Sequence, residues 1–250
     1  MGGLVLSIET ATLACSVALF EDQNVLGRIS EVTHAYIHAE RLLPLIDQIM
    51  KDHGKNRNQL TAVAVSSGPG SYTGLRIGVS TAKGICHALN IPLIPVGSLE
   101  SLAHQAVRSK QGPWDAILTV LDARRDEVFT ATFIPSSDGS LTSGEVRALV
   151  LDQPLPELFP KACDLQRVCV IGDAAEKTQT LLGERVEHWT FIQCYPDAQD
   201  AWKPALSAIK DRAFADVAYF EPRYLKEFIA GKPRDPLGLR SSSAEKKSSS

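Results

Sequence analysis

Residues 60–89 have the sequence LTAVAVSSGPGSYTGLRIGVSTAKGICHAL. The run from 60 to 67 is apolar and rich in β-branched residues, which predicts a buried strand. From residue 74 to residue 89 the apolar side chains recur at three- and four-residue spacing, which predicts a helix with one buried face. A glycine-rich turn joins the two, so this stretch predicts the strand–turn–helix unit of an α/β fold.

Similar units are expected on both sides of this stretch. Apolar spacing over 37–52 predicts a helix, in which Pro44 either introduces a kink or marks the first turn. The first half of the chain therefore has the order β-β-β-α-β-α-β-α. The expected elements around the central unit are strands at 4–8, 13–20, 24–32 and 91–96 and helices at 37–52 and 98–109.

The second half repeats this order of elements more weakly, without a repeat at the level of residues. We therefore predict two lobes, 1–108 and 109–230, divided at a polar stretch. The serine-rich segment 231–250 has almost no apolar side chains and is predicted to be disordered. The elements expected in the second half are strands at 116–121, 127–134, 145–150 and 168–172, a helix or turn at 154–160, and helices at 174–183 and 201–213.

The composition limits the class of protein. The chain has 250 residues, 44% hydrophobic and 22% charged, with a formal net charge of −3, as in a globular protein of one or two domains. Neither an apolar run of about 18 residues nor a basic signal segment occurs, so no membrane helix or signal peptide is expected. Five scattered cysteines favour a reducing, cytoplasmic location. The negative charge argues against a protein that binds nucleic acid on its own.

The glycine-rich turn is the strongest candidate binding site. Gly68 and Gly70 permit tight backbone turns, and free N–H groups at the start of a helix attract anions. Ser71 or Thr73 is suited to cap that helix. The motif is not a Walker A loop, because Leu75 stands where a lysine would follow the last glycine. The alternative is a turn that only joins a strand to a helix.

Two further glycines, Gly74 and Gly78, lie four residues apart in the predicted helix. Each costs a helix roughly 1 kcal/mol relative to alanine, which suggests a compensating close approach of another element. The approaching element belongs either to a partner protein or to the same chain, and the sequence leaves both readings open.

The first predicted hairpin offers a carboxylate and two hydroxyl groups. Glu9 ends a buried strand, and Thr10 and Thr12 follow it in the turn. Such a group is able to hold a magnesium ion and phosphates through water. The simpler alternative is a turn in which the threonines satisfy backbone groups.

Other clusters predict no catalytic or metal site. His34 and His38 have the spacing of a metal pair on a helix, but no third ligand is evident, and we expect surface or helix-start histidines. No G-x-S-x-G elbow or cysteine nucleophile signature occurs. The charged segment 122–127 is either a solvated turn or a loop that faces a cleft between the lobes.

Five segments together resemble the TsaB (YeaZ) family. They are 6–20, 38–47, 66–84 (whose S-S-G-P-G-S-Y-T-G is the most distinctive), 121–129 (L-D-A-R-R-D-E-V-F) and 221–226 (E-P-R-Y-L-K). The resemblance implies the actin-like ATPase and sugar kinase (ASKHA) fold, a ribonuclease H-like architecture. Each of its two lobes has a β-β-β-α-β-α-β core.

The resemblance also implies a function. It points to a non-catalytic subunit that binds and activates TsaD, which transfers a threonylcarbamoyl group to adenosine 37 of tRNA. TsaE is a further expected partner, and tRNA is expected to bind to the complex. A homodimer is a second expected assembly. The locally basic end from Arg223 to Ser250 is the part of this chain that is a candidate for touching RNA.

The same resemblance implies roles for particular residues. Ser98 and Leu102 stand where TsaD has metal-binding histidines, so no metal and no intrinsic cofactor are expected. ATP or ADP with magnesium is expected at the junction with TsaD. The residues implied at the partner interface are Leu42, Leu43, Ile46, Gly74, Arg76 and Gly78, and those implied for nucleotide are Glu9, Thr10, Thr12, Gly68, Gly70, Ser71 and Arg76.

A stand-alone ATPase or sugar-kinase-like phosphotransferase is the alternative function. Glu9, Gly68 and Gly70 would then cradle phosphates. Against it, Glu9 replaces the aspartate that is usual at this turn of the fold. A metallopeptidase is disfavoured because the two histidines are missing.

Overall fold

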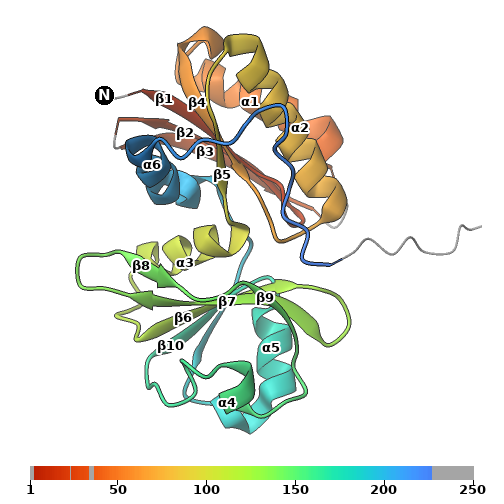
Figure 1. Ribbon diagram of the computed structural model, residues 1–250, viewed down its shortest axis with the longest axis vertical. Coiled ribbons are helices and arrows are strands. Elements are labelled where there is room, and N and C mark those ends of the chain that lie inside the picture. Colours follow the sequence, from red (N-terminus) through yellow and green to blue (C-terminus); the bar gives the residue numbers. More distant parts are fainter. Residues whose placement is uncertain (1–2, 23, 34–36, 227–250) are drawn as a thin grey trace, which may run out of the picture.

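The computed structural model describes residues 3–22, 24–33 and 37–226. Two mixed sheets, each flanked by helices, are stacked along the long axis of the molecule (Figure 1). The predicted disordered segment 231–250 lies outside the described residues. None of the helices that the structure describes is both long and apolar enough to cross a membrane.

The first sheet has the strand order β3-β2-β1-β4-β5. Its central strand β1 pairs with β2 in antiparallel and with β4 in parallel orientation. The parallel pair requires a crossover, which α1 provides. The elements are β1 (Leu4–Glu9), β2 (Ala14–Glu21), β3 (Asn24–Val32), α1 (His38–Asp52), the 3-10 turn η1 (Arg57–Gln59), β4 (Leu60–Ser66), α2 (Tyr72–Leu89) and β5 (Leu93–Val96).

The second sheet has the order β11-β10-β6-β7-β8, and β9 also pairs with β7. Both sheets therefore show the same 3-2-1-4-5 connectivity, which confirms the duplicated ASKHA architecture. The elements are α3 (Ser98–Arg108), β6 (Ala116–Asp122), β7 (Glu127–Pro135), β8 (Leu141–Ser143), β9 (Arg147–Val150), α4 (Leu155–Leu158), β10 (Val168–Gly172), α5 (Ala175–Leu182), η2 (Gly183–Val186), β11 (Thr190–Gln193), η3 (Ala198–Ala201) and α6 (Trp202–Asp211).

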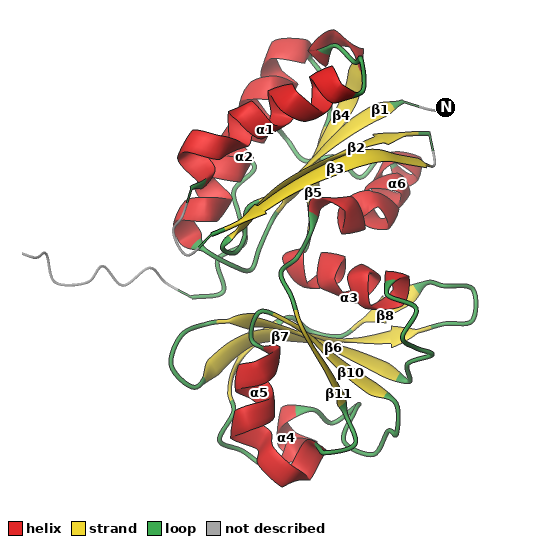
Figure 2. Cartoon of the chain, turned by 180° about the vertical axis from the view of Figure 1, so that it is seen from behind, coloured by secondary structure: helices red, strands yellow, loops and turns green. Residues whose placement is uncertain are grey.

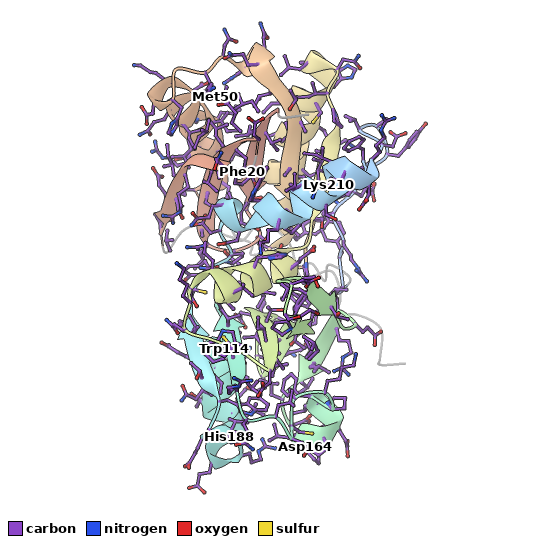
Figure 3. All side chains as sticks on the ribbon, turned by 90° about the vertical axis from the view of Figure 1, so that its left-hand side faces the viewer. Phe20, Met50, Trp114, Asp164, His188 and Lys210 are labelled. Atoms are coloured by element: carbon purple, nitrogen blue, oxygen red, sulfur yellow. The ribbon has the colours of Figure 1, made fainter. Side chains whose placement is uncertain are left out.

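Helices cover both faces of each sheet. The helices α1 and α2 pack on one face of the first sheet, while η3 and α6 pack on the other (Figure 2). Phe20 lies on the face that α6 covers, with its ring 4.9 Å from that of Trp202 (Figure 3). In the second sheet α3 packs on one face, and α4 and α5 on the other. Each apolar side of the sheets is therefore buried, as both cores require.

The packing crosses the predicted boundary at residue 108 in both directions. The helix α3 lies before that boundary, yet its side chains pack into the core of the second sheet. Conversely, α6 lies after the boundary and packs on the first sheet. Residues 215–226, which we call the C-terminal strap, start at β5, where Ala215 N donates to Leu93 O at 2.9 Å, and then run back beside α2.

Most element bounds agree with the sequence to within two or three residues. The strands β8 and β11 were not predicted, because they are short and partly exposed and carry no clear alternation. The helix α2 begins at Tyr72, two residues before the predicted start, because Ser71 caps it by accepting from Gly74 N at 3.2 Å. Pro44 lies inside α1 beyond its first turn.

Candidate functional site

Two turns meet at one edge of the first sheet. The turn after β1 and the glycine-rich turn after β4 lie side by side because parallel neighbouring strands end at the same edge. Ser71 N donates to Ala11 O at 2.6 Å, and Thr10 N donates to the Ser66 hydroxyl at 3.2 Å. The sequence predicted both turns, and the structure brings their residues into direct contact.

Glu9, Thr10 and Thr12 are buried in this contact, with exposed fractions of 2%, 0% and 5%. Glu9 Oε1 accepts from Ala11 N at 2.7 Å, and Thr12 Oγ1 accepts from Ala14 N at 3.3 Å. Burial raises the pKa of Glu9 to about 7, against the opposing hydrogen bonds. The Glu9 and Thr12 side chains thus satisfy backbone N–H groups of this turn, whereas the Thr10 hydroxyl is buried without a hydrogen-bond partner in the described part of the chain.

The glycine-rich turn is filled by carbonyl groups of the same chain. A Cβ atom at Gly68, where φ is +102°, would lie 2.6 Å from Arg223 O, and one at Gly70 would lie 2.4 Å from Ala11 O. Carbonyl oxygens carry partial negative charge and do not attract phosphate. With Glu9 buried beside them, the residues of this turn do not fit a nucleotide in this conformation.

The predicted role of Gly74 and Gly78 at a partner interface is corrected by the structure. Both glycines are buried and face Thr10, because Cβ atoms there would lie 2.2 Å from Thr10 O and Thr10 Oγ1 respectively. They permit close packing inside the chain. Leu42 and Ile46, which are 1% and 0% exposed, also belong to the core and offer no area to a partner.

Two residues from the predicted interface do reach the surface. Leu43 is 50% exposed on the outer side of α1. Arg76 is exposed on α2, with its guanidinium carbon 4.6 Å from the centre of the Tyr72 ring. The Tyr72 ring lies in turn 4.8 Å from that of Tyr224 in the C-terminal strap.

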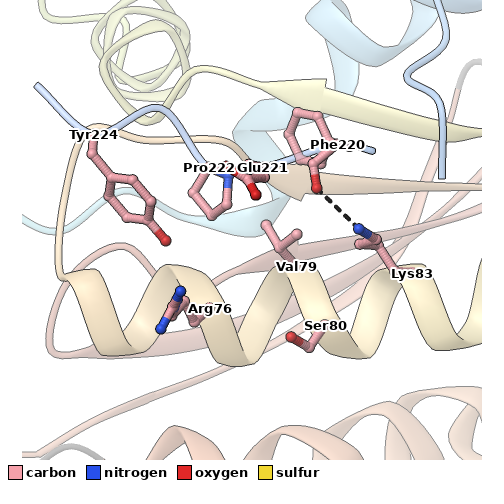
Figure 4. Close-up of a pocket in the computed structure, with 8 residues that line it drawn as sticks. All are labelled: Arg76, Val79, Ser80, Lys83, Phe220, Glu221, Pro222 and Tyr224. Carbon is pink, nitrogen blue, oxygen red and sulfur yellow. Dashed lines mark hydrogen bonds between the residues drawn. The ribbon is translucent and has the colours of Figure 1, made fainter. Parts of the chain in front are cut away.

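A pocket of about 150 Å³ lies between α2 and the C-terminal strap (Figure 4). Lys83 Nζ fixes the strap there, by donating to Ala218 O and Phe220 O at 3.0 Å each. Sequence reasoning missed this pocket because its two walls are more than 130 residues apart along the chain. The E-P-R-Y-L-K motif was the available signal. The lining residues are Arg76, Val79, Ser80, Lys83, Phe220, Glu221, Pro222 and Tyr224.

The strap also joins three of the motifs that were noted in the sequence. Arg223 N donates to Ser67 O in the glycine-rich turn at 2.7 Å. At its far end Lys226 Nζ donates to Ala123 O at 3.2 Å and forms an ion pair with Glu127. The segments 66–76, 121–129 and 221–226 therefore form one connected region, although they belong to different lobes.

Comparison with known proteins identifies the family. A family model described as TsaD, tRNA N6-adenosine threonylcarbamoyltransferase, matches residues 30–138. The tRNA threonylcarbamoyladenosine biosynthesis protein TsaB of Escherichia coli is 30% identical over 246 residues, 91% of this chain and 96% of that protein. This chain belongs to the TsaB family.

Solved structures of TsaB family members agree with the fold. A Pseudomonas aeruginosa protein similar to peptidase YeaZ has a TM-score of 0.77 and 26% identity, over 90% of this chain and all of that chain. YeaZ from the same organism has a TM-score of 0.75 and 27% identity, over 89% of this chain and all of that chain.

A further sequence relative is the TsaB protein of Haemophilus influenzae, which is 35% identical over about half of each chain.

The metal candidates of this TsaB family member are buried or lie outside the description. His38 is 0% exposed, and its Nε2 is hydrogen-bonded to Thr12 O at 2.8 Å. Burial lowers the pKa of His38, while His34 lies outside the described residues. Ser98 and Leu102 are both 0% exposed in α3. Over the ranges that the structure describes, no three His, Cys, Asp or Glu side chains cluster as metal ligands do.

Proposed function

We propose that this chain acts in the cytoplasm as a subunit in the synthesis of threonylcarbamoyladenosine on tRNA, where it binds and activates TsaD. Membership of the TsaB family supports the pathway. The observation that carries the non-catalytic role is the identity and burial of Ser98 and Leu102. The leucine has no ligand atom, and one serine hydroxyl inside the core does not replace two imidazole nitrogens.

The surface proposed for TsaD is the outer side of α1 and α2, bordered by the C-terminal strap. Leu43 supplies an exposed apolar side chain there, and Arg76 supplies a charge. Buried glycines set the position of α2 against the first turn, so this surface is rigid before any partner arrives. A homodimer through the same side of α1 is the corresponding assembly when TsaD is absent.

A nucleotide with magnesium is proposed at the junction of the two proteins. In this chain Arg76 is the exposed residue suited to contact a phosphate, since guanidinium groups form paired hydrogen bonds to phosphate oxygens. The buried turn with Glu9 has no such role in its present conformation. This proposal therefore assigns the remaining phosphate contacts to TsaD.

Reconstitution tests the function. The purified chain is added to TsaD, TsaE, the separate enzyme that makes threonylcarbamoyl-adenylate, ATP and unmodified tRNA, and modified adenosine is measured with and without it. We expect modification to require this chain. Equal modification in its absence would contradict the proposal, and ATP turnover by the chain alone that is lost in Glu9→Ala would favour the phosphotransferase alternative.

The interface is tested with a matched pair of variants. Leu43→Asp places a charge in the proposed contact, and because this side chain is half-exposed the fold should tolerate it. We expect Leu43→Asp to prevent co-purification with TsaD. The control is Leu181→Asp on α5 in the other lobe, where the leucine is 37% exposed. Retention of TsaD by both variants would place the interface elsewhere.

A further inference from the structure

The turn between β6 and β7 has an unusual backbone. Arg124 and Arg125 follow one another with φ values of +71° and +50°, and both are exposed. Glycine and asparagine adopt this left-handed region readily, whereas a longer side chain there is strained. Because both arginines are exposed, they gain no burial that would offset this backbone strain. A role of their side chains in function would explain why arginines stand at these two positions.

The turn is held from several sides. Ala123 N donates to Glu127 O at 3.1 Å across its base. Lys177 Nζ donates to Asp122 Oδ1 at 2.7 Å and to Glu127 O at 2.8 Å, and Lys226 binds the same turn from the strap. Two acidic neighbours, Asp122 and Glu127, are thereby paired with lysines. The two arginines are thus presented on a rigid support.

Arginines without a polar partner gather near this turn. Most described arginines bind a carboxylate or a carbonyl oxygen, as Arg41 and Arg167 do. Among the described residues, the guanidinium groups without such a bond are those of Arg76, Arg124, Arg125, Arg212 and Arg223. All except Arg212 belong to the connected region that the strap forms.

Contacts along the strap connect the segments that carry these four arginines. Lys226 reaches the turn at Ala123 O, and Arg223 lies three residues earlier, within about 10 Å along an extended chain. Tyr224 then stacks against Tyr72, whose ring is covered by Arg76. Arg76 is the residue proposed for the nucleotide, so we call Arg124, Arg125 and Arg223 the basic surface.

We propose that the basic surface binds the phosphate backbone of the tRNA, an inference that rests on the proposed function. Guanidinium forks match phosphate oxygens in geometry and charge, and a rigid support lowers the entropy lost on binding. Asp126 and Glu221 lie in the same segments and keep the local charge modest. The basic surface therefore supplements the tRNA contacts of TsaD within the complex.

The test measures tRNA affinity of the assembled complex with TsaD at several salt concentrations. Each lost phosphate contact makes the negative slope of log affinity against log salt shallower by about 0.7–0.9. We expect the double variant Arg124→Gln and Arg125→Gln to make the slope shallower by about 1.4–1.8 and to weaken binding. The control is Arg212→Gln, which removes an exposed, left-handed arginine outside the basic surface and should leave the slope unchanged.

A second variant separates binding from folding. Arg124→Asn with Arg125→Gly supplies residues that favour the left-handed backbone, so the melting temperature should rise by up to about 5 °C. The tRNA affinity of the complex should nevertheless fall as in the first variant. Unchanged tRNA affinity in both double variants would overturn the inference. Loss of co-purification with TsaD in either double variant would also overturn it, because the surface would then bind protein. Failure of the unmodified chain in reconstitution would instead refute the proposed function.

Discussion

The hydroxyl group of Thr10 occupies the space in which Gly78 would carry a side chain, since a Cβ atom there would lie 2.2 Å from Thr10 Oγ1. Real Cβ atoms do not approach an oxygen so closely. The helix α2 is thereby seated directly on the turn after β1. Thr10 is fully buried in this contact, so neither residue is able to move aside at low cost.

Gly78→Ala should therefore destabilise the chain, although alanine is normally the better helix former. We expect a loss of about 1–3 kcal/mol in the free energy of unfolding, from overpacking against Thr10. Gly84→Ala is the control, because nothing lies within 4 Å of its Cβ position in the same helix. It should stabilise by about 0.5–1 kcal/mol. The free energy of unfolding of both variants is measured by urea denaturation. If both substitutions were stabilising, the close contact between Gly78 and Thr10 would be contradicted.

Glu9 should make stability depend on pH. Its pKa in the folded chain, about 7, exceeds the ordinary value of 4.5, so the protonated form is favoured by folding. This stability is fully present below about pH 4.5 and is lost as the pH rises through 7, by roughly 3 kcal/mol in all. Glu9→Gln keeps an acceptor for Ala11 N and removes the titration.

The measurement is the free energy of unfolding of Glu9→Gln relative to the unmodified chain at pH 5 and pH 8. From pH 5 to pH 8 the unmodified chain should lose roughly 3 kcal/mol of its free energy of unfolding relative to Glu9→Gln. Glu145→Gln, at an exposed carboxylate, serves as the control for the loss of one acidic side chain. A difference that stays constant with pH would mean that Glu9 is ionised throughout.

Asp200 connects η3 to α3 through a paired hydrogen bond. Its carboxylate is buried, and Arg108 donates to it through Nε at 2.6 Å and Nη2 at 3.0 Å. Arg108→Met leaves the carboxylate without this partner, and we expect a loss of about 1–3 kcal/mol in stability. Adding Asp200→Asn should recover part of the loss.

The control for this pair is Arg167→Met, which breaks the more exposed ion pair with Asp115. Exposed pairs contribute about 0–1 kcal/mol, so this variant should be nearly neutral. Thermal or urea unfolding of the two single variants and the double variant gives the comparison. Equal losses for Arg108→Met and Arg167→Met would show that burial of Asp200 has no special effect.

Lys83 should control how firmly the C-terminal strap is held. Lys83→Met removes the donor to Ala218 O and Phe220 O, and the strap should open more often. We expect hydrogen exchange at the amides of Ala215 and Arg223 to accelerate about tenfold, with little change in global stability. Lys51→Met on the exposed side of α1 is the control. Equal exchange rates at the amides of Ala215 and Arg223 in both variants would contradict the role of Lys83.

The α/β class and most elements could be predicted from the sequence because they depend on local pattern. The spacing of Leu42, Ile46 and their neighbours predicted α1, and the apolar run after Leu60 predicted β4. The same pattern predicts that the apolar side chains of α1 and β4 are buried, but it does not predict which element packs on them. Leu42 and Ile46 could equally have faced a partner, and only the packing of α1 on the sheet of its own chain excludes this.

Partners distant in the sequence account for the parts that were missed. Residues 141–143 and 190–193 become strands because β7 and β10 offer free backbone groups beside them, which short segments do not reveal alone. Likewise, the amphipathic pattern of α3 predicted a buried face without indicating which sheet would cover it. Its contact with the second sheet depends on the direction in which the chain leaves β5.

The sequence by itself determined the elements, their duplicated order and the resemblance to the TsaB family, because periodicity and motifs are local properties. Only the tertiary structure decided the roles of the singled-out residues. Gly74 and Gly78 serve internal packing since Thr10 lies against them, and Glu9 is buried since two turns close over it. The strap brings Lys226 to the turn of Arg124 and Arg125, and Arg223 to the glycine-rich turn. Such contacts join residues roughly 60 to 160 positions apart, and no local pattern encodes that proximity.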